Sequence, residues 1–234
     1  MQPLQPVINA LVAARDPDSA AWLASITTAP PLPGSPAFMR AFAMAGRRLR
    51  GATALSDGEQ AVLRFLGIAR PDCWPLQRLL RAGMLAAAVD ASGDEAAARL
   101  TSAFRTSDNE ERATILQSLV LLPSPDRFAP LAADACRSSV QPVFEAIAAD
   151  NGFPASHFTD LAFNQMVLKA VFTGLALARV VGLELRTTAV LRRMAADFRS
   201  ERRAAGRPVP ADLDALLADP PDAPPCAPPD SSHR

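Results

Sequence analysis

The sequence predicts an all-α protein, and three observations carry this prediction. Ala and Leu dominate a chain of 234 residues that is 49% apolar, only 6% aromatic and free of Tyr, a composition that favours helices. Apolar residues recur at helical spacing between Pro- and Gly-rich breaks. No run of alternating polarity is bounded by hairpin turns, so no sheet is expected. We therefore predict a single domain of about ten helices over residues 1–218, arranged as an α-solenoid or an irregular helical bundle.

Helices in the N-terminal half are delimited by caps and prolines. An apolar stripe predicts the first helix over residues 4–12. Pro residues that follow a capping side chain are expected to start two more helices, at Asp16-Pro17 and Ser35-Pro36. A further helix is expected over residues 76–89. Three Ser-x-x-Glu patterns, each the signature of a capping box, predict helix starts at Ser56 with Glu59, Ser92 with Glu95 and Ser107 with Glu110.

Elements in the C-terminal half are separated by Pro, Gly and Ser residues. Residues 219–234 are Pro-rich with little that could be buried, which predicts a disordered tail. The expected elements are a helix over 126–137, a helix through 142–147 capped by Ser138-Ser139, a turn at Gly182, an amphipathic helix opened by Thr187 or Thr188, and a short helix over 213–217.

Residues 143–172 form the most informative stretch, which predicts a helix, a turn and a second helix that is apolar on nearly every side. Asn-Gly at 151–152 marks the turn, and Thr159 is placed to cap the second helix. A helix this apolar is expected inside a domain, where polar side chains need partners. It nevertheless carries Asn164, Gln165 and Lys169.

Lys169 is the only lysine in the chain, beside twenty-three arginines. A lone lysine in an apolar helix indicates a position that needs a compact ammonium group, which unlike guanidinium changes its pKa readily. The alternative is that its methylene stem packs in the core while its charged end reaches water.

Two polar arcs are expected on this second helix. If the helix begins near Ser156, then His157, Asp160 and Asn164 lie on one arc. Gln165 and Lys169, four residues apart, lie on another.

Glu145, on the preceding helix, is the expected counter-charge of Lys169. One interpretation of these polar residues is a network that holds two buried helices in register. The other is a pocket in which Glu145, Asn164, Gln165 and Lys169 bind a small polar or aromatic metabolite.

Three arginines are predicted to line one face of the helix that begins near residue 188: Arg192, Arg199 and Arg203. Such a stripe could bind a phosphate, an anionic lipid surface or an acidic partner. The alternative is a solvated face, because Asp197 and Glu201 are interleaved with it.

Composition excludes several classes of protein. The formal net charge is zero, so nothing requires a nucleic-acid partner. Three cysteines without a CxxC pair predict neither a disulfide framework nor a zinc site. His157 and His233 are the only histidines, too few for His-dependent or di-iron catalysis, and neither a Walker A motif nor GxGxxG occurs. We expect no metal, no cofactor and no assignable catalytic residue.

No segment predicts secretion or membrane insertion. The N-terminus lacks a basic region ahead of an apolar core, so it is not a convincing signal peptide. No window offers about 20 uncharged apolar residues, the length that a membrane-spanning helix requires. A cytoplasmic protein that does not span the membrane is expected.

Several segments resemble the EboA-domain family. The resemblance covers most of residues 35–217, and its longest run is specific. The matching segments are FAMAGRR at 42–48, VFEAIA at 143–148, NGFP at 151–154, FNQMVLKAVF at 163–172, Gly182-Leu183, Arg186, MAADF at 194–198 and ERRAAGRPV at 201–209.

The chain resembles a divergent member of that family. The family has Thr-Asn at the place of Ser138-Ser139 and Asn-Pro-Tyr-Pro at the place of residues 151–154. It has Trp at the place of Phe163, and His and Trp at those of Ser200 and Arg203. These changes remove polar groups that a pocket could use.

The resemblance implies a bacterial, cytoplasmic, all-helical protein that is encoded beside a UbiA-like prenyltransferase and several metal-dependent enzymes. Such clusters move secondary-metabolite precursors across the cytoplasmic membrane, so peripheral association with that membrane is an alternative location. The first interpretation is a non-catalytic accessory protein that binds a small metabolite or the enzymes of its cluster. The alternatives are an enzyme of unfamiliar type that uses Lys169 and Glu145, and a purely structural interaction module.

Overall fold

The computed structural model describes residues 4–49 and 54–217. Across these residues the secondary structure consists of fourteen α-helices and five short 3-10 segments, without a strand. The all-α prediction is confirmed. The predicted tail, residues 219–234, lies outside the described residues.

The N-terminal helices begin and end where proline and capping residues place them. Pro lies in the first turn of α2 and α3, after Asp16 and Ser35, whose side chains accept hydrogen bonds from backbone N–H groups of that turn. The elements are α1 (Leu4–Ala13), α2 (Pro17–Thr28), α3 (Pro36–Ala45), α4 (Asp57–Phe65), α5 (Leu76–Asp90), α6 (Ala96–Thr106) and α7 (Asn109–Ser118).

The later helices are shorter on average and interrupted by turns. Gly182 turns the chain as predicted, with φ of +73°, and a Cβ there would lie 2.8 Å from that of Ala155. The elements are α8 (Ala129–Ala135), α9 (Gln141–Ala148), α10 (Phe153–His157), α11 (Asp160–Thr173), α12 (Leu183–Arg186), α13 (Ala189–Ala204) and α14 (Asp212–Leu217).

The contacts divide the chain into two compact units, Met1–Arg186 and Thr187–Arg234. The sequence predicted a single domain over 1–218, and the division falls inside that range, at the turn before α13. In the second unit, α13 and α14 pack against each other and bury Leu191, Ala195 and Leu213.

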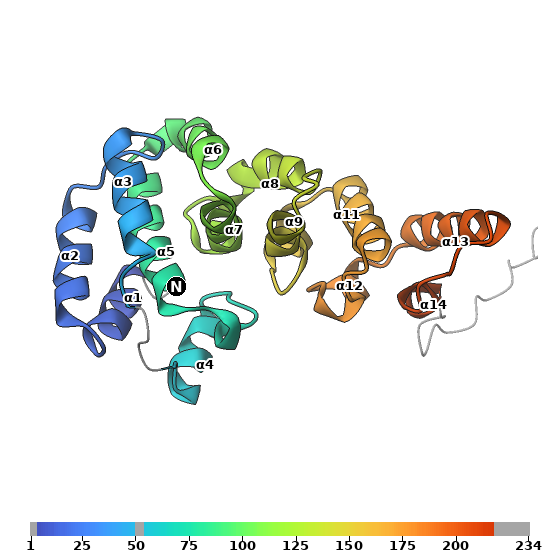
Figure 1. Cartoon of the computed structure of the whole chain (residues 1–234), viewed down its shortest axis with the longest axis horizontal. Coiled ribbons are helices and arrows are strands. Elements are labelled where there is room, and N and C mark those ends of the chain that lie inside the picture. Colours follow the sequence, from blue (N-terminus) through green and yellow to red (C-terminus); the bar gives the residue numbers. More distant parts are fainter. Residues whose placement is uncertain (1–3, 50–53, 218–234) are drawn as a thin grey trace, which may run out of the picture. The chain divides into compact units, whose positions relative to one another are not determined.

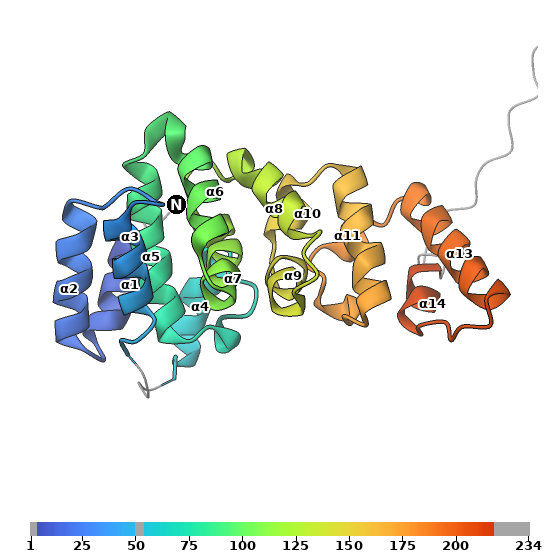
Figure 2. The ribbon, with the colours of Figure 1, turned by 45° about the horizontal axis from the view of Figure 1, so that its top comes forward.

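Within the first unit, helices that are close in sequence lie side by side (Figures 1 and 2). Helices α1, α2 and α3 pack around α5, which in turn contacts α6 and α7. Helix α9 packs against α7, α8 and α11. This local stacking resembles an irregular solenoid, because each layer buries its apolar face against the next layer.

Of the three predicted capping boxes, one is confirmed. Ser56 and Glu59 form a reciprocal box at the start of α4. The next helix with such a box, α7, uses Asp108 with Glu111, one residue later than the predicted Ser107 pair. Ser92 makes no cap, since its hydroxyl donates to Ala88 O within the previous helix turn.

The turn between α9 and α11 is held by the buried amide of Asn151. Its Nδ2 donates to Leu116 O at 3.2 Å and Ala146 O at 2.9 Å, while its Oδ1 accepts from Phe153 N at 3.0 Å. One side chain thus joins the ends of α7, α9 and α10. Asn151 thereby ties the turn to α7, and gives the Ala146 carbonyl and the Phe153 N–H a hydrogen-bond partner.

Candidate functional site

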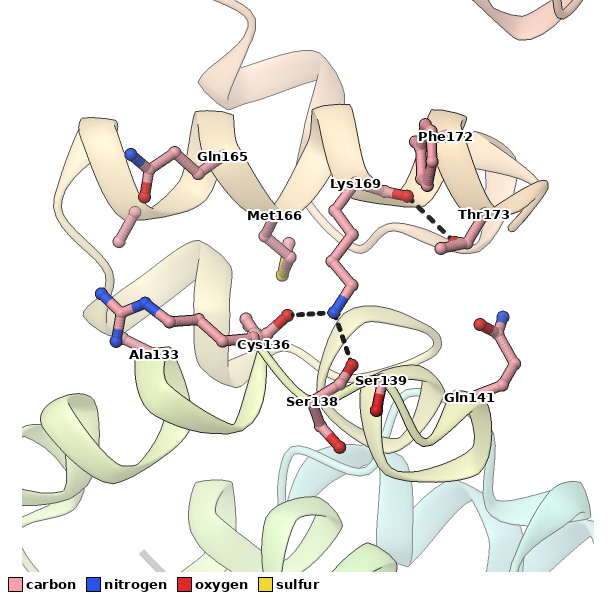
Figure 3. A pocket seen from close by; sticks show the side chains of 12 residues that line it. Ala133, Cys136, Ser138, Ser139, Gln141, Gln165, Met166, Lys169, Phe172 and Thr173 are labelled. Carbon is pink, nitrogen blue, oxygen red and sulfur yellow. Dashed lines mark hydrogen bonds between the residues drawn. The ribbon is translucent and has the colours of Figure 1, made fainter.

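A pocket of about 590 Å³ lies between α11 and the segment that joins α8 to α9. We name it the Lys169 pocket. Figure 3 shows its side chains, which come from the end of α8, the connecting turn, the start of α9 and one face of α11. It is lined by Ala133, Cys136, Arg137, Ser138, Ser139, Gln141, Ala162, Gln165, Met166, Lys169, Phe172 and Thr173.

Lys169 crosses this pocket from α11 to the turn on the other side (Figure 3). Its Nζ donates to Cys136 O and to Ser138 O, each at 2.6 Å, and lies 4.5 Å from the centre of the Phe144 ring. Cys136 caps the C-terminal end of α8, where carbonyls lack helical partners and carry partial negative charge. Burial lowers the pKa of the ammonium, while these carbonyls and the ring favour its charged form.

Cys136 supplies a carbonyl to this arrangement, and its thiol is not suited to nucleophilic chemistry. Burial raises the pKa of the Cys136 thiol to about 12, an effect that the nearby Lys169 charge opposes without overcoming. The thiol is therefore neutral near pH 7, and only a thiolate is an effective nucleophile. Cys136 acts as a small apolar wall residue.

Neutral polar groups surround the mouth of the pocket. Gln141 donates to Glu145 Oε1 at 2.9 Å, and the hydroxyl of Ser138 accepts from Val140 N at 3.2 Å. In the described part of the chain, the side chains of Ser139 and Gln165 have no hydrogen-bond partner. These two exposed groups are available to a ligand.

Glu145 is not the counter-charge of Lys169, so that expectation is wrong. Its carboxylate accepts from Gln141 and lies 4.0 Å from Arg179. Among the described residues, no carboxylate lies within 4.0 Å of the Lys169 ammonium. Backbone carbonyls of Cys136 and Ser138 accept hydrogen bonds from this ammonium instead. The predicted ion pair between Glu145 and Lys169 is not formed.

Asn164 and Gln165 face different surroundings. Gln165 lines the pocket and is exposed, whereas Asn164 is 2% exposed and does not line it. The Asn164 Oδ1 is buried without a hydrogen-bond partner among the described residues. The structure brings Gln165 and Lys169 together in the pocket, but not Asn164 or Glu145.

His157 and Asp160 lie outside the pocket, and the predicted arc through Asn164 is wrong. Phe158 adopts an extended backbone that ends α10, and Thr159 then caps α11 as predicted. The His157 ring packs against the Phe153 ring in a tilted arrangement, with 4.7 Å between their centroids. Asp160 accepts from Arg186 Nη2 at 2.8 Å, a structural contact at the start of α11.

The predicted arginine stripe lies on α13, in the second unit, where two members contact α14. Arg192 donates to Leu216 O at 3.3 Å, and Arg199 lies 3.6 Å from the Asp214 carboxylate. Arg203 is exposed. Arg192 and Arg199 therefore take part in the packing of α14 on α13, and are less available to bind an anion than the sequence predicted.

Sequence reasoning missed most of the pocket lining. The expected cap formed by Ser138-Ser139 is wrong, since Val140 precedes α9 without a side-chain cap. Both serines line the pocket instead. The resemblance to the EboA-domain family could have revealed Ser138 and Ser139. They stand at one of the places where the chain departs from the family pattern.

Two features that the described residues lack bear on the kind of site. No group of three or more His, Cys, Asp or Glu side chains there is arranged to hold a metal ion. In the same residues, no helix combines the length and the apolar character needed to cross a membrane.

Fold and site together define an all-helical protein with an open pocket beside a lysine-capped helix end. The sequence model of the family described as "Metabolite traffic protein EboA" matches residues 8–218. The chain therefore belongs to the EboA family. No curated protein and no solved structure matches the chain.

Proposed function

We propose that this protein is a non-catalytic accessory protein that binds a small metabolite in the Lys169 pocket. The observation that carries this proposal is the pocket itself, which at about 590 Å³ has the size of small-molecule sites. Its walls include apolar Cys136, Met166 and Phe172, and its mouth carries unpartnered Ser139 and Gln165. A few polar groups around an apolar hollow are typical of ligand sites.

The family description, which names metabolite traffic, supports this proposal. We further propose that the metabolite is a secondary-metabolite precursor undergoing processing or export. The partners would be a UbiA-like prenyltransferase and other enzymes of the same cluster, as the sequence resemblance implies. The protein would act in the cytoplasm or at the inner surface of the membrane.

Mass spectrometry of small molecules that co-purify with the protein tests metabolite binding. The wild type is compared with Ala162→Trp, which places an indole in the pocket, and with Gln165→Trp, which obstructs its mouth. The control is Ala61→Trp, an exposed position on α4 that lines none of the described pockets. Circular dichroism checks that each variant is folded.

We expect one compound or one chemical series to co-purify with the wild type and the control, and to be lost from both pocket variants. Equal recovery from all four proteins would contradict metabolite binding in this pocket. The enzyme alternative that pairs Lys169 with Glu145 is not supported by their geometry, because Glu145 contacts Gln141 and Arg179 instead.

A second candidate, partner binding without a metabolite, is favoured by one observation. Leu161, Leu168 and Phe172 fall on one face of α11 by their spacing, and Leu161 and Phe172 are 62% and 67% exposed. Loss of a co-purifying enzyme from Leu161→Ser, with the small molecules retained, would separate this role from metabolite binding. Retention of the enzyme by Leu161→Ser would contradict it.

A further inference from the structure

We infer that the ligand of the Lys169 pocket is a small organic acid with an apolar body and a carboxylate. This inference rests on the proposed function and names its ligand class. Three features support this ligand class: the charge of the lining, the orientation of two helix ends and the apolar walls.

Only cations carry charge in the lining. Among its twelve residues, the charged side chains are those of Arg137 and Lys169. Arg137 is 74% exposed at the edge of the pocket, where its Nη1 lies 3.2 Å from the similarly exposed Asp134 carboxylate. Solvent weakens an exposed ion pair of this kind, so a bound anion can share the Arg137 charge.

Helix ends reinforce this preference. The ammonium of Lys169 occupies the C-terminal end of α8 and offsets the partial negative charge of its carbonyls. The N-terminal end of α9, with its partial positive charge, lies at the pocket through Gln141, where Pro142 has no N–H and the Val143 and Phe144 N–H groups donate to Val140 O. The Lys169 ammonium thus offsets the negative end of α8, whereas the positive end of α9 lies beside the pocket as a partial charge without a neutralising carboxylate in the lining.

The other residues of the lining indicate what the uncharged part of the ligand is like. Apolar side chains of Met166, Cys136 and Phe172 suit a ring or a short aliphatic body. Ser139 and Gln165 add hydrogen-bond donors without a negative charge. No aspartate or glutamate lines the pocket to repel a carboxylate.

Three ligands that share one apolar body test the inference: 1-naphthylacetate, 1-naphthylacetamide and 2-(1-naphthyl)ethylamine. Their binding to the full chain is measured by isothermal titration calorimetry at low and moderate salt. We expect the acid to bind about tenfold more tightly than the amide, as a charge-assisted contact would provide, and the amine to bind most weakly. Added salt should weaken the binding of the acid, and should not weaken that of the amide or the amine appreciably.

Arg137→Gln should lower the affinity for the acid about tenfold and leave that for the amide unchanged. Arg40→Gln removes the same charge from an exposed position on α3, outside the lining, and should change neither affinity. Lys169 is left intact, because its ammonium also holds the turn after α8.

The outcomes separate this inference from the proposed function. Equal or tighter binding of the amide or the amine, abolished by Ala162→Trp, would overturn the preference for an acid while pocket binding stands. An unchanged affinity of Arg137→Gln for the acid would likewise overturn the preference for an acid while pocket binding stands. Absence of binding by all three ligands would overturn the inference and also count against the pocket as a metabolite site.

Discussion

Two buried asparagines, Asn151 and Asn164, show that burial alone does not reveal the role of an amide. Asn151 makes three hydrogen bonds that join the ends of three helices. Asn164 is also buried, yet its Oδ1 has no partner among the described residues. A satisfied amide stabilises a fold, whereas an unsatisfied one costs free energy.

Replacement of each asparagine by leucine, which has the same branching and the same number of side-chain heavy atoms, should therefore give opposite results. We expect Asn151→Leu to lower the free energy of unfolding by about 3 kcal/mol, because the Ala146 carbonyl and the Phe153 N–H lose their partner and the Leu116 carbonyl loses one of its two donors. Asn164→Leu should lie within about 1 kcal/mol of the wild type or raise its stability. Urea unfolding measures both, and an equally large loss at Asn164 would contradict the contrast.

Lys169 acts first as a structural residue. We expect Lys169→Met, which keeps an unbranched side chain one atom shorter than lysine, to lower the free energy of unfolding by about 2 kcal/mol, because two carbonyls lose a charged donor. Arg40→Met removes an exposed cation from α3 and should change stability by less than about 0.5 kcal/mol. Similar unfolding midpoints for the two variants would show that the Lys169 contacts contribute little.

At the scale of elements, a bidentate ion pair joins the residues after α1 to the start of α4. Arg15 donates to both carboxylate oxygens of Glu59, at 2.8 and 2.7 Å, while Glu59 also accepts from Ser56 N at the helix cap. Hydrogen bonds from Arg15, and to a smaller degree those from Ser56, hold the pKa of Glu59 at about 2. The same carboxylate therefore serves a helix end and a tertiary contact.

This depressed pKa makes the contact sensitive to acid. The Glu59 carboxylate has a lower pKa in the folded protein than in the unfolded chain, so its contribution is fully present above about pH 4.5 and is lost as the pH falls toward 2. We expect this loss to reach up to about 3 kcal/mol. Urea unfolding between pH 7 and pH 2.5 should show it in the wild type and to a much smaller extent in Glu59→Gln.

The matched control is Asp57→Asn, on the same first turn of α4. The Asp57 carboxylate forms no ion pair within the described residues, so the acid sensitivity should be kept. A Glu59→Gln protein with the pH dependence of the wild type would assign the acid loss to other carboxylates.

The start of a helix could be predicted where the sequence allows only one position for the capping motif. It could not be predicted where two overlapping positions are possible. Around α7 the sequence SDNEE satisfies the pattern from Ser107 and again from Asp108, and the structure uses the second. At α11 the cap at Thr159 was predicted correctly, but the break at Phe158 was missed. That break needs tertiary contacts, which local propensity does not encode.

The candidate site was predictable only in part. Lys169 was found because it is the single lysine, and Gln165 because it lies one helical turn before Lys169. The partners of Lys169 could not be found, since they are backbone carbonyls and any residue type can supply one. Glu145 was a reasonable counter-charge by residue type, but the rotation of α9 turns its carboxylate toward Arg179.

At the scale of the whole molecule, all twelve residues of the Lys169 pocket belong to the first unit. A protein that ends at Arg186 should therefore fold and keep the pocket, since domains with their own core fold independently. We expect its affinity for 1-naphthylacetate to equal that of the full chain, with a helical circular-dichroism spectrum. Loss of binding in a folded fragment would show that the second unit contributes to the site.

The bridge that Lys169 makes between α11 and the α8–α9 turn also suggests a way to search for a natural ligand. An occupant of the hollow would touch both of its walls, and any compound held only by the folded protein raises the temperature of heat denaturation as its concentration grows. A melting screen of cell extracts, fractionated and followed by a dye, could therefore isolate such a ligand before any reaction is available to assay.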